Sequence, residues 1–193
     1  ADLVLVTGVY AAREPDPGDV SGAQVAAAVG RPAGYVPTLA EALPWLQERL
    51  APGDVVKVDL GAHVDGYPAD TSVTVELGTR NHQRLISCAE DALRMAIEMV
   101  APGTTTSAIG EAVERAIKSA GFRPVDNLTG HSMERFNLHA GVSIPNVKTR
   151  DSDDIEEGMI LAIEPFSTTG KGPSLKSAGT FQIFRSNSPP GSK

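Results

Sequence analysis

The stretch GDVVKVDLGAHVDGYPADTSVTVEL, residues 53–77, decides the fold of this chain. Apolar and polar residues alternate on both sides of Asp65-Gly66, a dipeptide that suits the two positive-φ positions of a type I′ turn. The stretch therefore predicts two antiparallel strands joined by a tight turn, with Val64 facing Tyr67.

Two aspartates of this hairpin form a candidate metal site. In the predicted register Asp59 faces Ser72 and Asp70 faces Gly61, so the two carboxylates share one face as diagonal neighbours, with Cα atoms about 7–8 Å apart. Carboxylates at that separation can converge on one or two metal ions. Asp59 also follows the apolar run VVKV, where an unpaired charge is costly. From these residues alone, a turn-capping Asp59 and a surface Asp70 remain the alternative.

The residues before the hairpin alternate between strand and helix patterns. An apolar run at 3–7 predicts a buried strand, and Ser21 begins an alanine-rich helix that ends at Gly30. A second helix is predicted from Thr38 to about Leu50, with Pro44 kinking it or resetting its start. This alternation favours a short α/β segment with parallel strands.

The residues after the hairpin predict two helices and then strands and loops. Each helix has one apolar stripe, over 85–100 and over 109–120, and Pro102-Gly103 and Gly121 end them. Strands are expected at 138–144, 159–164 and about 179–185. The hairpin, the helix pair and the later strands together predict an α+β fold.

Composition and charge exclude several classes of function. The 193 residues include 17 basic and 24 acidic side chains, and this net charge of −7 is opposite to that of a general nucleic-acid binder. No apolar run is long enough to span a bilayer. Cys88 is the single cysteine, so no intrachain disulfide can form. These features predict a cytoplasmic protein that binds neither nucleic acid nor membrane.

Further candidate ligands follow downstream. His131 is predicted in a loop after NLTG, His139 follows in LHAG, and Glu164 ends the apolar run MILAIEP. A carboxylate at the end of a buried strand needs a cationic partner. Imidazole together with carboxylates suits Mn, Fe, Co or Zn. Taken alone, the two histidines are better interpreted as hydrogen-bonded loop residues than as metal ligands.

Three motifs resemble methionine aminopeptidase of the second type, in its archaeal form. They are residues 53–77, NLTGHSMERFNLHAGVSIPNV at 127–147 and EEGMILAIEPFSTTGKG at 156–172, and the resemblance covers about 53–185. It implies a pita-bread fold, one or two divalent metal ions (Co, Mn, Fe or Zn) and hydrolytic removal of N-terminal methionine from nascent chains. The implied metal ligands are Asp59, Asp70, His131 and Glu164. By the same resemblance His139 is the catalytic residue that contacts the scissile peptide.

The sequence departs from that family in two places. The family has a fifth ligand, a glutamate on a late strand, whereas no acidic residue follows Glu164 here and GTFQIF offers Gln182 instead. The family also has a substrate-contacting histidine upstream of the hairpin, whereas no histidine precedes His63. We therefore expect a truncated pita-bread core with weak activity or none.

Residues 1–52 resemble instead the C-terminal domain of UDP-N-acetylmuramate–alanine ligase, so the predicted domains are 1–52 and 53–193. Two alternatives to a peptidase follow: a non-catalytic pita-bread module that binds a protein partner, and a chimeric fragment without an evolved function. An unfinished sheet exposes unpaired strand edges. We therefore also expect self-association through the predicted strand at 179–185.

Overall fold

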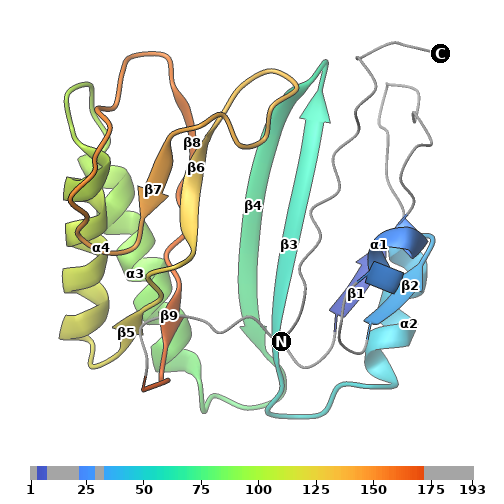
Figure 1. Cartoon of the computed structure of the whole chain (residues 1–193). Helices are drawn as coiled ribbons and strands as arrows, with labels where there is room; N and C mark the ends of the chain where they lie inside the picture. The colour runs from blue at the N-terminus through green and yellow to red at the C-terminus, as the bar shows by residue number, and fades with distance from the viewer. Residues whose placement is uncertain (1–3, 8–21, 29–32, 172–193) are drawn as a thin grey trace. The chain divides into compact units, whose positions relative to one another are not determined.

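The computed structural model describes residues 4–7, 22–28 and 33–171 (Figure 1). The chain folds as two compact units, and the boundary between them lies between Ala51 and Pro52. Among the helices in the described ranges, none combines the length and the apolar character that a bilayer span requires. The predicted strand at 179–185, and the self-association assigned to it, lie outside the described residues.

In its described residues, the first unit contains two strands and two helices; the first strand and both helices were predicted, whereas the strand at 33–36 was not. They are β1 (Val4–Thr7), α1 (Gly22–Ala28), β2 (Ala33–Val36) and α2 (Leu39–Gln47). Strands β1 and β2 pair in parallel, as expected of an α/β segment, whereas the predicted strand at 55–60 belongs to the antiparallel hairpin that follows. Helix α2 begins directly after Thr38 and continues through Pro44, so the proline does not reset its start.

The second unit begins with the predicted hairpin, which we call the β3–β4 ribbon. It consists of β3 (Val55–Val64) and β4 (Tyr67–Glu76), and Val64 pairs with Tyr67 as the sequence predicted. Asp65 and Gly66 have φ values of 52° and 81°, the left-handed conformations that the turn requires. The register places Asp59 opposite Ser72 and Asp70 opposite Gly61, so both carboxylates lie on one face.

The opposite face of the β3–β4 ribbon is apolar. It carries large hydrophobic side chains that are exposed to solvent, namely Val58, Leu60, Val64, Tyr67, Val73 and Val75. We call this surface the apolar ribbon face. The two-residue alternation of the strands therefore separates a polar face with both aspartates from a face with large aliphatic and aromatic side chains.

Two amphipathic helices supply most of the buried core. They are α3 (Gln83–Met99) and α4 (Thr106–Ser119), as the two apolar stripes predicted. Their facing side chains are buried together with Ile144 and Ile155, the main members being Cys88, Ala92, Ala96, Ile109, Val113 and Ile117. Cys88 is a free, buried thiol. This core fixes the position of the strands that carry the candidate ligands.

Short strands complete the unit: β5 (Arg123–Pro124), β6 (Thr129–Met133), β7 (Ser143–Pro145), β8 (Ile160–Ala162) and β9 (Ser167–Thr168). They form a β7–β6–β8 sheet and a β5–β9 pair. In Figure 1 the β3–β4 ribbon stands beside this sheet, and α4 packs against β7 on its other side.

Two predictions for this region were wrong. The segment containing His131 was expected to be a loop but is strand β6, which pairs with strands on both sides. The strand expected at 138–144 is mostly loop, because the backbone turns through Gly141 at a φ of 104° and only Ser143–Pro145 pairs with β6. The overall α+β class is nevertheless as predicted.

Candidate metal centre

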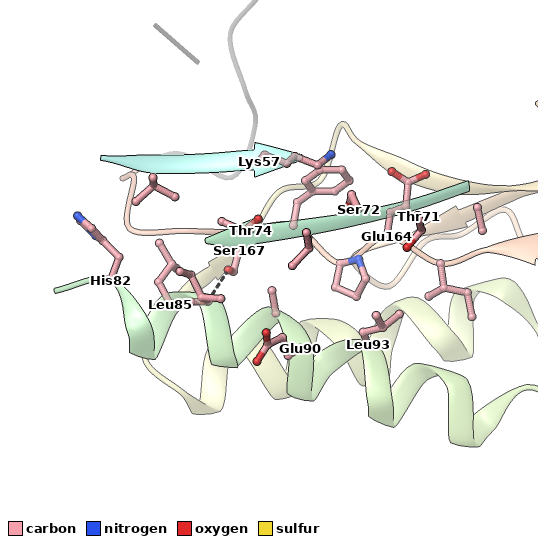
Figure 2. Close-up of a pocket in the computed structure, with 18 of the residues that line it drawn as sticks. Lys57, Thr71, Ser72, Thr74, His82, Leu85, Glu90, Leu93, Glu164 and Ser167 are labelled. Atoms are coloured by element: carbon pink, nitrogen blue, oxygen red, sulfur yellow. Dashed lines mark hydrogen bonds between the residues drawn. The ribbon is translucent and has the colours of Figure 1, made fainter. Parts of the chain in front are cut away.

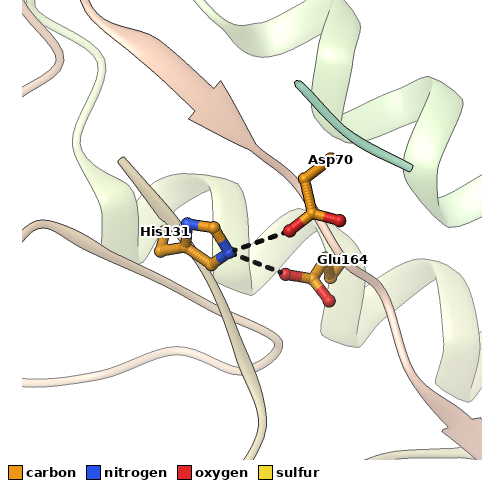
Figure 3. A group of neighbouring side chains, drawn as sticks. All are labelled: Asp70, His131 and Glu164. Carbon is orange, nitrogen blue, oxygen red and sulfur yellow. Dashed lines mark ion pairs between the residues drawn. The ribbon is translucent and has the colours of Figure 1, made fainter. Parts of the chain in front are cut away.

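Three of the predicted ligands converge on one point. Asp70 comes from β4, His131 from the central strand β6, and Glu164 from the segment that follows β8 (Figure 3). One ligand atom of each side chain lies within 4.8 Å of those of the other two. His131 Nε2 is 3.4 Å from Asp70 Oδ2 and 3.4 Å from Glu164 Oε1.

The sheet register explains why His131 and Glu164 meet. His131 pairs with Ala162, so Glu164, two residues further on, points to the same side of the sheet. Gly130 makes the close approach possible, because a Cβ atom at this position would overlap the carbonyl oxygen of Ala162. The glycine before the histidine is therefore a structural requirement of the site.

The imidazole of His131 is oriented like that of a metal ligand. Its ring is buried, and Nδ1 lies 3.4 Å from the carbonyl oxygen of Ser132. When Nδ1 carries the proton, Nε2 presents its lone pair to the two carboxylates. Three electron-pair donors then face one another, and a cation between them relieves their mutual repulsion. The donor set thus fits a divalent ion.

The surroundings of Glu164 also favour a bound cation. Burial raises the pKa of Glu164, and the neighbouring Asp70 carboxylate raises it further, while His131 and Lys57 act in the opposite direction. A metal ion at this point would favour the ionised carboxylate.

Asp59 is not part of the converging group. It lies on the same ribbon face as Asp70, but its Oδ2 is 2.8 Å from Lys57 Nζ, and its side chain is 56% exposed. Lys57 Nζ also lies 4.7 Å from the centre of the Phe166 ring. The register prediction for Asp59 is therefore correct, while its carboxylate is paired with a lysine.

His139 lies next to the converging group. Its ring centroid is 4.2 Å from that of His131, with the planes tilted by 58°. Although His139 is exposed by area, the atoms around its ring desolvate it and lower its pKa, and His131 lowers it further. Both effects favour the neutral imidazole of His139, whose one N–H can donate a hydrogen bond.

A cavity of about 580 Å³ opens beside Asp70 and Glu164 (Figure 2). It lies between β4, α3 and the segment after Glu164, and its lining includes Val55, Lys57, Leu85, Leu93 and Phe166. Sequence reasoning did not identify Lys57 or Phe166 as part of the site. The spacing of these residues was the available signal, because residues two apart in an extended segment point to the same side. Lys57 precedes Asp59 by two residues, and Phe166 follows Glu164 by two.

Comparison with known proteins identifies the family to which this fold and this site of two carboxylates and one imidazole belong. Residues 21–184 match metallopeptidase family M24, and the chain belongs to that family. The matched range begins within the segment that resembles a ligase domain.

Curated relatives are named methionine aminopeptidase. The protein of Methanothermobacter thermautotrophicus is 50% identical over 136 residues, which are 69% of this chain and 45% of the relative. That of Pyrococcus horikoshii is 47% identical over 131 residues, 67% of this chain and 44% of the relative. The chain thus spans a little under half the length of these relatives.

Solved structures show the same architecture. Methionine aminopeptidase from Rickettsia prowazekii is 31% identical with a TM-score of 0.59, over 63% of this chain and 50% of that one. Prolidase from Pyrococcus furiosus is 27% identical with a TM-score of 0.54, over 60% of this chain and 34% of that one. The α+β unit is therefore part of a pita-bread fold, as the sequence motifs implied.

Proposed function

We propose that this chain is a metal-dependent aminopeptidase that removes N-terminal methionine from nascent polypeptides. The observation that carries the proposal is the convergence of Asp70, His131 and Glu164 in a member of family M24. The curated relatives named methionine aminopeptidase support the same reaction. A nascent-chain substrate implies that the protein acts in the cytoplasm.

In this proposal Asp70, His131 and Glu164 hold a divalent ion, and Asp59 contributes a further ligand when Lys57 moves away from it. When bound, the ion supplies Lewis acidity toward the scissile carbonyl and a nucleophile at neutral pH. Two carboxylates and one imidazole suit Co, Mn, Fe and Zn alike, so the donor set does not select one of these metals.

The remaining residues bind and orient the peptide. Neutral His139, beside His131, donates its N–H toward the substrate carbonyl. The cavity beside Asp70 and Glu164 has apolar walls from Leu85, Leu93 and Phe166, which accommodate an uncharged side chain such as that of methionine. Its position next to the ligands would place the bond after the first residue at the metal centre.

We further propose that turnover by this chain is weak. Lys57 neutralises Asp59, the ligand that a second ion would need. A single ion at Asp70, His131 and Glu164 is the expected occupancy.

The test is a Co²⁺ titration of the whole chain followed by visible spectroscopy and calorimetry, combined with an assay for methionine release from a Met-Ala-Ser peptide. We expect about one equivalent of Co²⁺ to bind, and His131→Ala and Glu164→Gln to abolish binding. Asp91→Asn is the matched control, because Asp91 is an exposed acid paired with Arg94 on α3. Wild-type protein that binds no Co²⁺, or Co²⁺ binding that survives His131→Ala, would refute the proposed site.

A further inference from the structure

The β3–β4 ribbon carries Asp70, yet among the described strands its two members pair only with each other. The other two ligands, His131 and Glu164, belong to or follow the β7–β6–β8 sheet. No backbone ladder between the described strands of these two sheets fixes the distance from Asp70 to His131. Other contacts must therefore hold the ribbon against the sheet.

At the tip of the ribbon, the loop after β6 binds both carbonyls of the turn. Arg135 Nε donates a hydrogen bond to the carbonyl oxygen of Asp65 at 2.8 Å. The backbone N–H of Phe136 donates to the carbonyl oxygen of Gly66 at 2.7 Å. Both acceptors are main-chain atoms whose positions are set by the type I′ turn, so the loop binds the turn conformation itself.

Side chains of the same loop enclose the turn. The Phe136 ring packs so closely on Gly66 that a Cβ atom there would overlap it. The Arg135 guanidinium lies 4.9 Å from the centre of the Phe136 ring and 5.5 Å from that of Tyr67. Gly66 is the single buried residue between Val55 and Glu76, which shows how completely this contact covers an otherwise exposed ribbon.

The backbone of the loop is set up for this contact. Glu134 and Asn137 exchange two backbone hydrogen bonds, each of 2.9 Å, and close a tight turn. Phe136, inside that turn, has a φ of 58°, a left-handed conformation that costs a non-glycine residue free energy. Contacts elsewhere must compensate for this cost, and the contacts that Phe136 makes are with Gly66 at the ribbon tip.

The geometry points to Arg135 and Phe136 as positioning residues for the metal centre: they clamp the tip of the ribbon to the end of β6 and so hold Asp70 within reach of His131 and Glu164. Arg135 lies two residues after Met133, which ends β6, the strand that carries His131. Asp70 lies four residues beyond Gly66, or about 13 Å along the strand. This inference rests on the proposed metal site.

The experiment compares Arg135→Ala, Arg135→Lys and Gly66→Ala with the control Arg94→Ala, which removes an exposed arginine on α3. Two measurements are made on the whole chain: hydrogen–deuterium exchange of the metal-free protein and Co²⁺ affinity. We expect Arg135→Ala and Gly66→Ala to speed exchange in residues 55–76 while α3 and α4 stay protected. Co²⁺ affinity should fall roughly tenfold, as for other residues that orient metal ligands.

Arg135→Lys retains a cationic donor at the turn and should recover part of the Co²⁺ affinity, which a general loss of stability would not allow. Ribbon exchange and Co²⁺ affinity equal to those of Arg94→Ala would overturn the inference. Faster ribbon exchange with unchanged Co²⁺ affinity would overturn it too, because Asp70 would then need no clamp. If the wild-type chain binds no Co²⁺, the proposed metal function fails, and ribbon exchange in the metal-free protein still decides whether the clamp exists.

Discussion

Gly130 lies against the end of β8, and replacing it tests how tightly the site is packed. In Gly130→Ala the new methyl group meets the carbonyl oxygen of Ala162, so the strands must separate. We expect a loss of about 1–3 kcal/mol in the free energy of unfolding, typical of overpacking, and weaker Co²⁺ binding. Urea denaturation and Co²⁺ titration measure the two effects.

Gly61→Ala is the matched control for this substitution, because it also adds one methyl group to a strand glycine. The nearest atom to a Cβ at Gly61 is the carbonyl oxygen of Ala69, at an ordinary contact distance of 3.9 Å. Equal losses of stability in the two variants would contradict the close approach of β6 and β8.

Glu114 makes the stability of the helix pair depend on pH. Its hydrogen bond with Lys118 and that from the backbone N–H of Lys148 lower the pKa of Glu114 in the folded chain. A carboxyl group whose pKa is lower in the folded chain than in the unfolded chain stabilises the fold at any pH above its pKa in the unfolded chain. This stabilisation disappears as the pH falls through its pKa in the folded chain.

We therefore expect Glu114→Gln to lower the thermal midpoint at pH 7 and to have little effect at a pH well below 4.5, the ordinary value for this group. Thermal melts of both proteins between pH 3 and pH 7 provide the measurement. Glu111→Gln serves as the control, since Glu111 pairs with the Lys148 ammonium rather than with its backbone. A difference between Glu114→Gln and wild type that grows on acidification would contradict the assignment.

At the scale of elements, the base of the β3–β4 ribbon is fastened to the start of α3 by Glu76. Its carboxylate accepts the backbone N–H groups of Asn81 and His82, each at 2.7 Å, and also the hydroxyl of Thr79. An acidic group at a helix N-terminus satisfies orphan N–H groups and interacts favourably with the helix dipole.

Glu76→Ala should therefore lower the free energy of unfolding, because the backbone N–H groups at the start of α3 lose their acceptor. Chemical denaturation followed by circular dichroism measures this, with Glu98→Ala, an exposed acid near the other end of α3, as the control. If both variants unfold at the same denaturant concentration, Glu76 has no capping role.

The ribbon and the two helices could be predicted from the sequence because their signals are local. Strict alternation around Asp65-Gly66 fixed the register, and apolar spacing of three and four fixed α3 and α4. Strand β6 lacks such a signal, since Thr129–Met133 is a strand through pairing on both sides. The segment that carries His131 is therefore a strand because it pairs with residues distant in the sequence, which a short stretch of sequence does not reveal.

The candidate site, like the fold, could be predicted from the sequence only where it depends on neighbouring residues. The diagonal placement of Asp59 and Asp70 follows from the hairpin alone, whereas the meeting of Asp70, His131 and Glu164 depends on contacts between distant segments. Family resemblance supplied that information. The pairing of Asp59 with Lys57 was not anticipated, although both residues lie on one face of β3.

At the scale of the whole molecule, a bound ion would join three segments that are far apart in the sequence. An ion that binds the folded chain and not the unfolded one stabilises it by about 2.7 kcal/mol when its concentration is one hundred times the dissociation constant. We expect Co²⁺ to raise the thermal midpoint and EDTA to reverse the change. His131→Ala should show no such increase, and an equal increase in that variant would place the ion elsewhere.

The apolar ribbon face determines how the protein should behave during purification. This face exposes six large hydrophobic side chains to water: Val58, Leu60 and Val64 on one strand, and Tyr67, Val73 and Val75 on the other. Sulfate salts make such contact more unfavourable because they are excluded from protein surfaces. The chain should therefore bind phenyl resin firmly and precipitate at low concentrations of ammonium sulfate, despite its net charge of −7.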